Sequence, residues 1–325
     1  MPAKVYSPTP ANLRRLAAAL RRGELVAIPT ETVYGLAANA LEARACRAIF
    51  RAKGRPANDP LIVHVLGLAQ AEQLAEFNPM ARRLARRFWP GPLTLVLPKK
   101  ACVPGVVTSG GNTVAVRAPA HPLARRLLRL AKVPLAAPSA NLFGYISPTE
   151  PAHVVDGLGG RIAHVLDGGT CAVGVESTVL DVTDPQRPRI LRPGAIDAAM
   201  LGKFLGLRVE GPAPRRAGKR QLRAPGMLAR HYSPRTPLRL RDPGLRRPHD
   251  VAGVFLRKPA GPSRDDAFWL SNRGALAEIA RNLYRVLRAA DQQGCREIWI
   301  EPLPADAGGL ATAIRDRLMR AAAKR

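Results

Sequence analysis

Apolar strand patterns and amphipathic helical patterns alternate over the first two hundred residues of this 325-residue chain. Residues 13–20 place leucine and alanine along one helix face, and Gly23 ends that pattern. Residues 25–28 then form an apolar run that stops at Pro29, as is typical of a buried strand. Because such units recur, the sequence predicts an α/β fold in which helices flank a twisted mixed sheet.

The remaining elements follow the same two patterns. We expect further strands at residues 61–66, 93–97, 113–117, 134–137, 164–166 and 178–182. We expect helices at residues 46–53, 79–88, 121–131 and 197–205. Strand patterns at 251–256 and 297–300, with helical patterns at 275–290 and 307–322, predict a second, small Rossmann-like α/β domain.

A basic segment separates the two regions. Residues 211–247 contain 11 Lys and Arg, one acidic residue, six Pro and four Gly, a composition that favours extended chain over helix. Within this segment, residues 224–234 form an apolar and aromatic island that a simple spacer does not need. We therefore expect a domain at residues 1–210, a linker at 211–247 and a small domain at 248–325.

The chain carries 51 Lys and Arg against 24 Asp and Glu, a formal net charge of +27. A charge of this size attracts polyanions, and nucleic acid is one candidate partner. Arginine pairs such as Arg82 with Arg83 fit a solvated helix face equally well. Charge alone leaves both interpretations open.

Familiar catalytic signatures are absent from the sequence. It has no P-loop, GxGxxG or GxSxG motif, and its four cysteines form no CxxC pair. Zinc sites, disulfide frameworks and a catalytic cysteine are therefore not expected, and this cysteine usage fits a cytoplasmic protein. No apolar run approaches the roughly 20 residues of a membrane helix, and residues 1–12 lack the pattern of a signal peptide.

Polar side chains gather where the predicted strands end, as at residues 29–35, 136–141, 174–178 and 191–194. Because ligands of open α/β sheets bind at strand ends, these clusters together predict a polar cleft that takes an anion. Taken singly, each has a structural explanation. Thr30 fits the N-cap of a following helix, and His64 alone fits a satisfied core histidine. Lys53 and Arg55 fit either a helix C-terminus or a clamp for triphosphate.

Nine motifs occur in order along the chain. They are PTETVYGL (29–36), KGRP (53–56), PLIVH (60–64), WPGPLT (89–94), TVAVRAPAHP (113–122), APSAN (137–141), SPT (147–149), GVEST (174–178) and LRPG (191–194). In these motifs the sequence resembles the YrdC-like family, and in particular its longer, two-domain threonylcarbamoyl-AMP synthases. The resemblance covers residues 13–205 and continues at residues 224–234.

The resemblance implies a nucleotidyltransferase that joins L-threonine, bicarbonate and ATP into threonylcarbamoyl-AMP and pyrophosphate. In the family this product supplies the threonylcarbamoyl group of a modified adenosine in tRNA. The implied candidate partners are therefore tRNA and the tRNA threonylcarbamoyl transferase. Mg²⁺ is expected to accompany ATP, held largely by phosphates and water, so that no dedicated metal site is expected.

Matching motifs imply the site residues. Lys53, Arg55, Ser139 and Asn141 resemble the family's polar tetrad around the reacting phosphate and carbamate. The residues implied to bind L-threonine are Thr32, His64, Arg117, Ala137 and Ser177. Those implied to bind ATP are Arg55, Asp59, Thr113, Ser139, Ser147, Arg192, His231 and Tyr232. His231 and Tyr232 belong to the aromatic island, which is expected to close over the nucleotide as a lid.

Two stretches depart from the family pattern. Asn58 precedes Asp59, the reverse of the order common in relatives, so the ATP contact there falls to Asn58, to Asp59 or to neither. Residues 142–146 (LFGYI) are bulkier than the small polar residues usual at that place. They either narrow the mouth of the pocket or pack against the lid.

Two other functions compete with this one. A non-catalytic RNA-binding module of translation or ribosome assembly accounts for the net charge and the basic linker, but has no need of the tetrad. A carbamoyl transferase of the hydrogenase-maturation type uses a similar domain. Those proteins place an acylphosphatase-like domain and Cys-rich zinc motifs upstream, and this chain has no CxxC.

Overall fold

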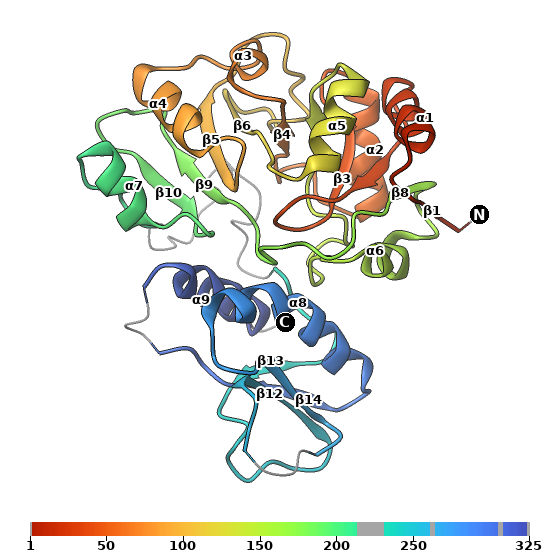
Figure 1. The fold of residues 1–325 in the computed structure, drawn as a ribbon, viewed down its shortest axis with the longest axis vertical. Helices are drawn as coiled ribbons and strands as arrows, with labels where there is room; N and C mark the ends of the chain where they lie inside the picture. Colours follow the sequence, from red (N-terminus) through yellow and green to blue (C-terminus); the bar gives the residue numbers. More distant parts are fainter. Residues whose placement is uncertain (1, 213–230, 261–263, 305–307, 324–325) are drawn as a thin grey trace.

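The computed structural model describes residues 2–212, 231–260, 264–304 and 308–323, which form two sheets of different size (Figure 1). We call residues 2–212 the N-terminal part and the other described residues the C-terminal part. The predicted linker residues 213–230, including residues 224–230 of the aromatic island, lie outside the described residues. Within the described residues, no helix combines the length and the apolar character that crossing a membrane requires.

The N-terminal part contains a ten-stranded sheet in the order β1-β8-β2-β3-β7-β4-β6-β5-β9-β10. Its strands are β1 (Lys4–Tyr6), β2 (Val26–Ile28), β3 (Gly35–Asn39), β4 (Ile62–His64), β5 (Leu93–Pro98), β6 (Thr113–Arg117), β7 (Leu135–Ala136), β8 (His164–Leu166), β9 (Thr178–Asp181) and β10 (Arg189–Arg192). β4 and β6 run parallel, whereas β2 and β3 are antiparallel, so the sheet is mixed. This confirms the predicted fold class.

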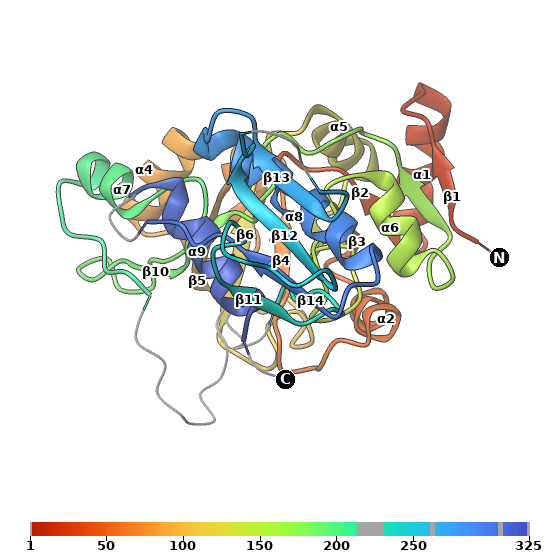
Figure 2. The same ribbon diagram turned by 90° about the horizontal axis from the view of Figure 1, so that it is seen from below.

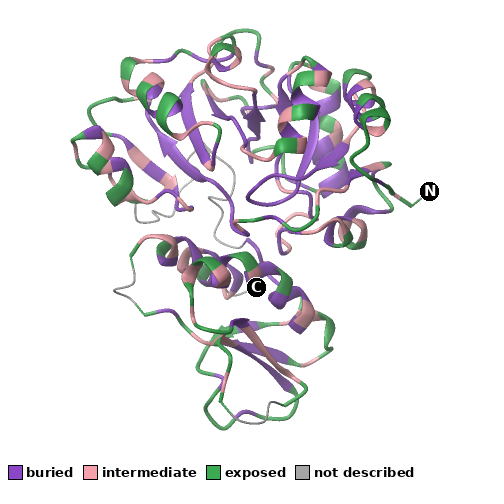
Figure 3. Ribbon diagram, viewed as in Figure 1, coloured by how far each residue is buried: buried purple, intermediate pink, exposed green. Residues whose placement is uncertain are grey.

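Helices cover both faces of this sheet because successive strand residues point to opposite sides. Ala37 packs in one apolar cluster with α1 (Pro10–Arg21) and α5 (Pro122–Ala131). Its neighbours Leu36 and Ala38 belong to the cluster that contains residues of α2 (Ala43–Lys53), α4 (Pro79–Phe88), α6 (Pro151–Leu158) and α7 (Ala198–Leu205). The short α3 (Leu68–Ala71) precedes α4. Figure 3 shows the result: buried strands between helices whose outer faces are exposed.

The C-terminal part contains a four-stranded sheet in the order β11-β14-β12-β13, and all its pairs are parallel. Its strands are β11 (Leu238–Leu240), β12 (Val251–Arg257), β13 (Ala267–Ser271) and β14 (Glu297–Ile300). Helices α8 (Leu276–Gln292) and α9 (Leu310–Ala321) lie between this sheet and the N-terminal part (Figures 1 and 2). β11 falls within residues 211–247, the range predicted as linker.

The strands and helices expected for residues 13–205 are present, but Thr30 does not cap a helix, the structural alternative considered for it. A strand, β3, follows instead, and it pairs with β2 as a hairpin. The Thr30 hydroxyl accepts hydrogen bonds from the backbone N–H groups of Thr32 and Val33, both at 3.2 Å, and donates to the Val33 carbonyl at 2.6 Å. The same local hydrogen bonding that caps helices thus closes a strand-to-strand turn.

Gly174 marks where α8 rests on the N-terminal part. Its φ of +81° is a conformation that side chains disfavour. A Cβ atom there would stand 2.4 Å from the Ala280 carbonyl oxygen and 2.4 Å from the Arg281 Cα, both in α8. Nearby, Val175 packs in the apolar cluster of the C-terminal part. The two parts therefore meet backbone to backbone at this glycine.

We expect Gly174→Ala to destabilise the protein by about 2 kcal/mol or more, because it adds a clash to a strained backbone conformation. Urea unfolding checks this. Gly157→Ala is the matched control, since Gly157 lies in α6 with nothing within 4 Å of its added Cβ, and alanine there should stabilise slightly. Equal effects of the two variants would contradict the packing described.

Candidate active site

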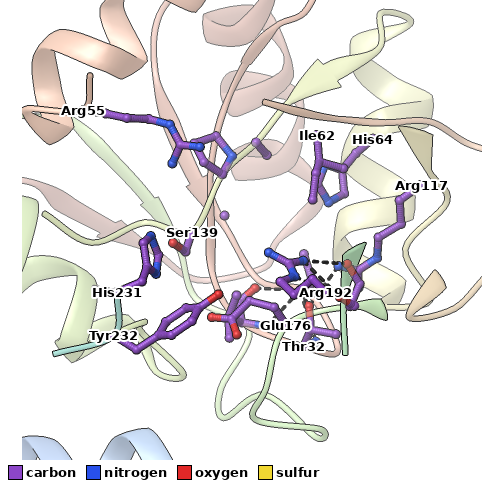
Figure 4. Close-up of a pocket in the computed structure, with 16 residues that line it drawn as sticks. Thr32, Arg55, Ile62, His64, Arg117, Ser139, Glu176, Arg192, His231 and Tyr232 are labelled. Atoms are coloured by element: carbon purple, nitrogen blue, oxygen red, sulfur yellow. Dashed lines mark hydrogen bonds between the residues drawn. The ribbon is translucent and has the colours of Figure 1, made fainter. Parts of the chain in front are cut away.

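The ends of several strands of the large sheet meet around one pocket (Figure 4). It contains about 480 Å³ of empty space, part of which is open to solvent. The lining comes from the β2–β3 turn, from β4, from the ends of β6 and β10, from the residues after β7 and from those before β9. His231 and Tyr232 of the C-terminal part complete it. This is the polar cleft predicted at the strand ends.

Ten of the fifteen predicted site residues line this pocket. They are Thr32, Arg55, His64, Arg117, Ala137, Ser139, Ser177, Arg192, His231 and Tyr232. The other five, Lys53, Asp59, Thr113, Asn141 and Ser147, do not line it. Four of these five are buried behind the lining, and Thr113 is half-buried at the far end of β6 from Arg117.

Arg117 and His64 stand together at one end of the pocket, because the parallel register of β4 and β6 pairs them. An Arg117 Nη1 atom donates to the Thr32 hydroxyl at 2.9 Å, and Nη2 lies 2.7 Å from Glu31 Oε1. Burial raises the pKa of Glu31, but the Arg117 charge and hydrogen bond outweigh it and lower that pKa overall. At this end of the pocket, the Thr32 hydroxyl and the Glu31 carboxylate therefore hold the Arg117 guanidinium in place.

The His64 imidazole is fully inside this end, and among the described residues its Nδ1 has no hydrogen-bond partner. Burial first, and then repulsion from Arg117, lower the pKa of His64 to about 3. The ring is therefore neutral at pH 7. A neutral imidazole beside a carboxylate-binding arginine can accept a hydrogen bond from an ammonium group.

The opposite end of the pocket is rich in cations, and Figure 4 shows Arg55 well apart from Arg117. Lys53 ends α2, where Gly54 adopts the left-handed conformation that stops a helix. Its Nζ donates to the backbone carbonyls of Ser139 at 2.6 Å and Asn141 at 2.5 Å. Burial and the nearby Arg55 charge lower the pKa of Lys53 well below its usual value. Lys53 thus stands directly behind Ser139, one layer away from the pocket.

Arg55 reaches the pocket from the turn after α2. Its Nη2 pairs with an Asp59 carboxylate oxygen at 2.9 Å, and it donates to the backbone carbonyls of Asp59 at 3.0 Å and Pro60 at 2.8 Å. Asp59 has no exposed side chain. Its contact is therefore with Arg55 rather than with the pocket, so Asp59 orients the guanidinium.

Arg192 and Ser177 form a third group between the two ends. The guanidinium donates through Nε (3.1 Å) and Nη2 (3.0 Å) to the Ser177 carbonyl, and through Nη2 to its hydroxyl at 3.1 Å. The Thr94 hydroxyl lies 2.8 Å from the same Ser177 hydroxyl. A Cβ at Gly194 would stand 2.2 Å from the Thr178 nitrogen, so glycine is needed for β10 to approach this close.

His231 and Tyr232 are buried, and each carries a polar atom that lacks a hydrogen-bond partner among the described residues: His231 Nδ1 and the Tyr232 hydroxyl. Phe143 meets the His231 ring edge to face at 6.0 Å, which places the bulky segment 142–146 against these residues. Unpaired buried polar atoms are costly, so these two atoms need a partner such as a water molecule or a bound ligand.

Glu176 also lines the pocket, although sequence reasoning assigned it no role. It is buried and accepts a hydrogen bond from the Ser147 hydroxyl at 2.6 Å. Its position as a carboxylate within the GVEST cluster was the one available signal. Glu31 was missed in the same way within PTETVYGL. Within the described residues, no group of three or more His, Cys, Asp or Glu side chains could hold a metal ion.

We expect the neutral, buried His64 to make stability depend on pH. Its pKa of about 3 in the fold lies below the ordinary 6.5, so the unfolded chain binds the extra proton between these values. The contribution of neutral His64 to the free energy of unfolding is fully present above pH 6.5. It decreases as the pH falls, by about 2 kcal/mol at pH 5. Urea unfolding at pH 7 and pH 5 should show a smaller loss for His64→Gln than for wild type.

His249→Gln is the control for this measurement, because His249 is exposed. It should lose as much stability on acidification as wild type. A loss in His64→Gln equal to that of wild type would mean that His64 does not titrate as a buried neutral group.

Residues 18–194 match a protein family described as "Telomere recombination", and residues 196–323 match "Threonylcarbamoyl-AMP synthase, C-terminal domain". The chain is 43% identical to threonylcarbamoyl-AMP synthase of Pyrococcus abyssi, over 96% of this chain and 94% of that protein. It is 40% identical to the Bacillus subtilis protein of the same name, over 96% and 93%. The crystal structure of P. abyssi Sua5 complexed with L-threonine superimposes with a TM-score of 0.87 at 38% identity, covering 98% of each chain. The chain belongs to the threonylcarbamoyl-AMP synthase family and has both of the family's parts.

Proposed function

We propose that this chain condenses L-threonine, bicarbonate and ATP to threonylcarbamoyl-AMP and pyrophosphate within the single pocket described above. The observation that carries the proposal is the division of that pocket. One end holds a buried arginine beside a neutral histidine, and the other holds buried basic side chains, Arg55 among them. An amino acid fits the first end and a polyphosphate the second, so the two substrates meet between them.

We assign threonine to the Arg117 end. The Arg117 guanidinium pairs with the threonine carboxylate, and the His64 imidazole accepts a hydrogen bond from its amine. Thr32 holds Arg117 from one side. The Ser177 hydroxyl and the backbone of Ala137 complete the subsite. Threonine binding by the P. abyssi relative is consistent with this assignment.

ATP occupies the cationic end. Arg55, Ser139 and Arg192 face its phosphates, and Lys53 holds the Ser139 segment in place from behind. His231 and Tyr232 cover the nucleotide, and their unpaired polar atoms, His231 Nδ1 and the Tyr232 hydroxyl, form hydrogen bonds with it. Asp59, Asn141 and Ser147 act from behind the lining, Asp59 by orienting Arg55. A role for Thr113 stays a prediction.

The chemistry requires positioning and charge stabilisation rather than a protein nucleophile. The neutral threonine amine and bicarbonate give a carbamate with loss of water. A carbamate oxygen then attacks the α-phosphorus in line, and the bond to the bridging oxygen breaks to release pyrophosphate. Cations at the phosphate end stabilise the charge that develops on the leaving group. Mg²⁺ enters with ATP as part of the substrate, held mainly by phosphates and water.

We further propose that the product serves tRNA threonylcarbamoyladenosine formation in the cytoplasm, with tRNA or its threonylcarbamoyl transferase as partner. The division of the chain into residues 1–210, 211–247 and 248–325 remains part of the same proposal. The alternative of a non-catalytic RNA-binding module rests on the +27 charge and the basic linker. Membership of a synthase family and a pocket with two chemically distinct ends favour the enzyme.

Pyrophosphate release tests the proposed reaction. Release from ATP should require both L-threonine and bicarbonate. Lys53→Met should lower it by about 10²–10³-fold, because it removes the hydrogen bonds to the Ser139 and Asn141 carbonyls and the ammonium charge that bound phosphates would stabilise. Lys100→Met, an exposed lysine, is the matched control and should keep full activity.

Each omission has its own meaning. Release that continues without threonine would indicate a different acceptor in the same fold. A well-folded wild-type protein that releases no pyrophosphate would favour the RNA-binding module. Full activity of Lys53→Met would show that Lys53 has no role at the phosphate end of the pocket.

A further inference from the structure

The Glu176 carboxylate is shared between the two parts of the chain. Its Oε1 accepts from the Ser147 hydroxyl at 2.6 Å, within the N-terminal part. Its Oε2 accepts from the Tyr284 hydroxyl in α8 at 2.9 Å and from Arg317 Nε in α9 at 2.8 Å. Both carboxylate oxygens are therefore occupied, one by each part. The orientation of a pocket-lining side chain thus depends on two helices outside the large sheet.

Arg317 is entirely buried, with no exposed side-chain surface. Besides Glu176, its Nη1 pairs with the neighbouring Asp316 at 2.9 Å. Removing a buried arginine from water is expensive, and a well-packed apolar residue often stabilises a fold as well or better. A buried ion pair that ends on a pocket residue is therefore better explained by the geometry it imposes there than by stability.

The same two residues also hold Tyr232. The Arg317 guanidinium lies 5.2 Å from the centre of the Tyr232 ring. The Tyr284 ring stacks on the Tyr232 ring, with 5.8 Å between the two ring centres. Tyr232 has a φ of +63°, a backbone conformation that persists only where surrounding contacts fix it. Arg317 and Tyr284 are among those contacts.

α8 also forms hydrogen bonds with the two residues that precede Ser147. Arg288 Nη2 donates to the Ile146 carbonyl at 2.5 Å, and the Tyr145 hydroxyl donates to Asp291 at 2.8 Å. The hydroxyl of Ser147 is therefore set from two directions, through its backbone neighbours and through Glu176. The Arg117 end has no such dependence in its side-chain contacts, since Thr32 and Glu31 both belong to the N-terminal part.

We propose that Arg317 and Tyr284 are positioning residues for the nucleotide half of the pocket. By orienting Glu176, and through it Ser147, and by holding Tyr232, they make ATP binding depend on docking of α8 and α9. Threonine binding, built from the N-terminal part, does not share this dependence. This inference rests on the proposed function, because it assigns ATP to the end that Tyr232 covers.

Calorimetric binding of a non-hydrolysable ATP analogue and of L-threonine, each measured separately, tests the proposal. Arg317→Met should weaken binding of the analogue about tenfold or more, because a charge-assisted hydrogen bond to Glu176 is lost. Threonine affinity should change less than about twofold. Arg296→Met is the control, since it breaks an exposed ion pair with Asp250 in the same part of the chain and should alter neither affinity.

Tyr284→Phe is the second variant, because it removes one hydrogen bond to Glu176 without changing the ring. It should lower the affinity for the ATP analogue several-fold and leave the affinity for threonine unchanged. In a protein that already carries Glu176→Gln, Tyr284→Phe should cause little further loss of analogue affinity. An equal loss of affinity for the analogue and for threonine would overturn the proposal. Unchanged affinity for the analogue in both Arg317→Met and Tyr284→Phe would also overturn it. Pyrophosphate release by wild type tests the proposed function separately, so failure of one can be told from failure of the other.

Discussion

A site that receives a polyanion has to hold several cations away from water before the anion arrives. Here backbone carbonyls do most of that holding. Lys53 donates to the carbonyls of residues 139 and 141, Arg55 to those of 59 and 60, and Arg192 to that of 177. Carbonyl dipoles orient a cation without cancelling its charge, as a full complement of carboxylates would. The segments that follow α2 and β7 and the one that precedes β9 are therefore shaped around these three side chains.

This arrangement explains why the two ends of the pocket differ in charge although both are buried. At the Arg117 end, Glu31 balances the guanidinium, and His64 stays neutral because burial and Arg117 both oppose its protonation. Away from that end, the Arg55 and Arg192 guanidinium groups both line the pocket, and Asp59 pairs with Arg55. In the proposed assignment, a zwitterion of modest size binds at the Arg117 end and a highly charged nucleotide beside Arg55 and Arg192.

The sequence patterns predicted the strands that are continuously apolar and the helices with one apolar face, and strand ends located most of the pocket. β3 was missed because its residues, GLAAN, have little strand propensity and are held as a strand by pairing with β2 and β7. Lys53 was predicted at the phosphate, but which layer it occupies depends on where residues 139–141 fold back. The role of Glu176 could not be read locally, because its partners Tyr284 and Arg317 lie 108 and 141 residues further along the chain.

The shared carboxylate of Glu176 also has a meaning for a chain under synthesis. Tyr284, the first of its C-terminal partners, is made 108 residues after Glu176, which at about 5–20 residues per second is an interval of roughly 5 to 20 seconds. During that time the large sheet can form with the Arg117 end of its pocket, while Glu176 has its Ser147 contact but neither Tyr284 nor Arg317. The part of the pocket that includes Glu176 and Tyr232 is finished last, so a nascent chain passes through a state in which one half of its pocket precedes the other.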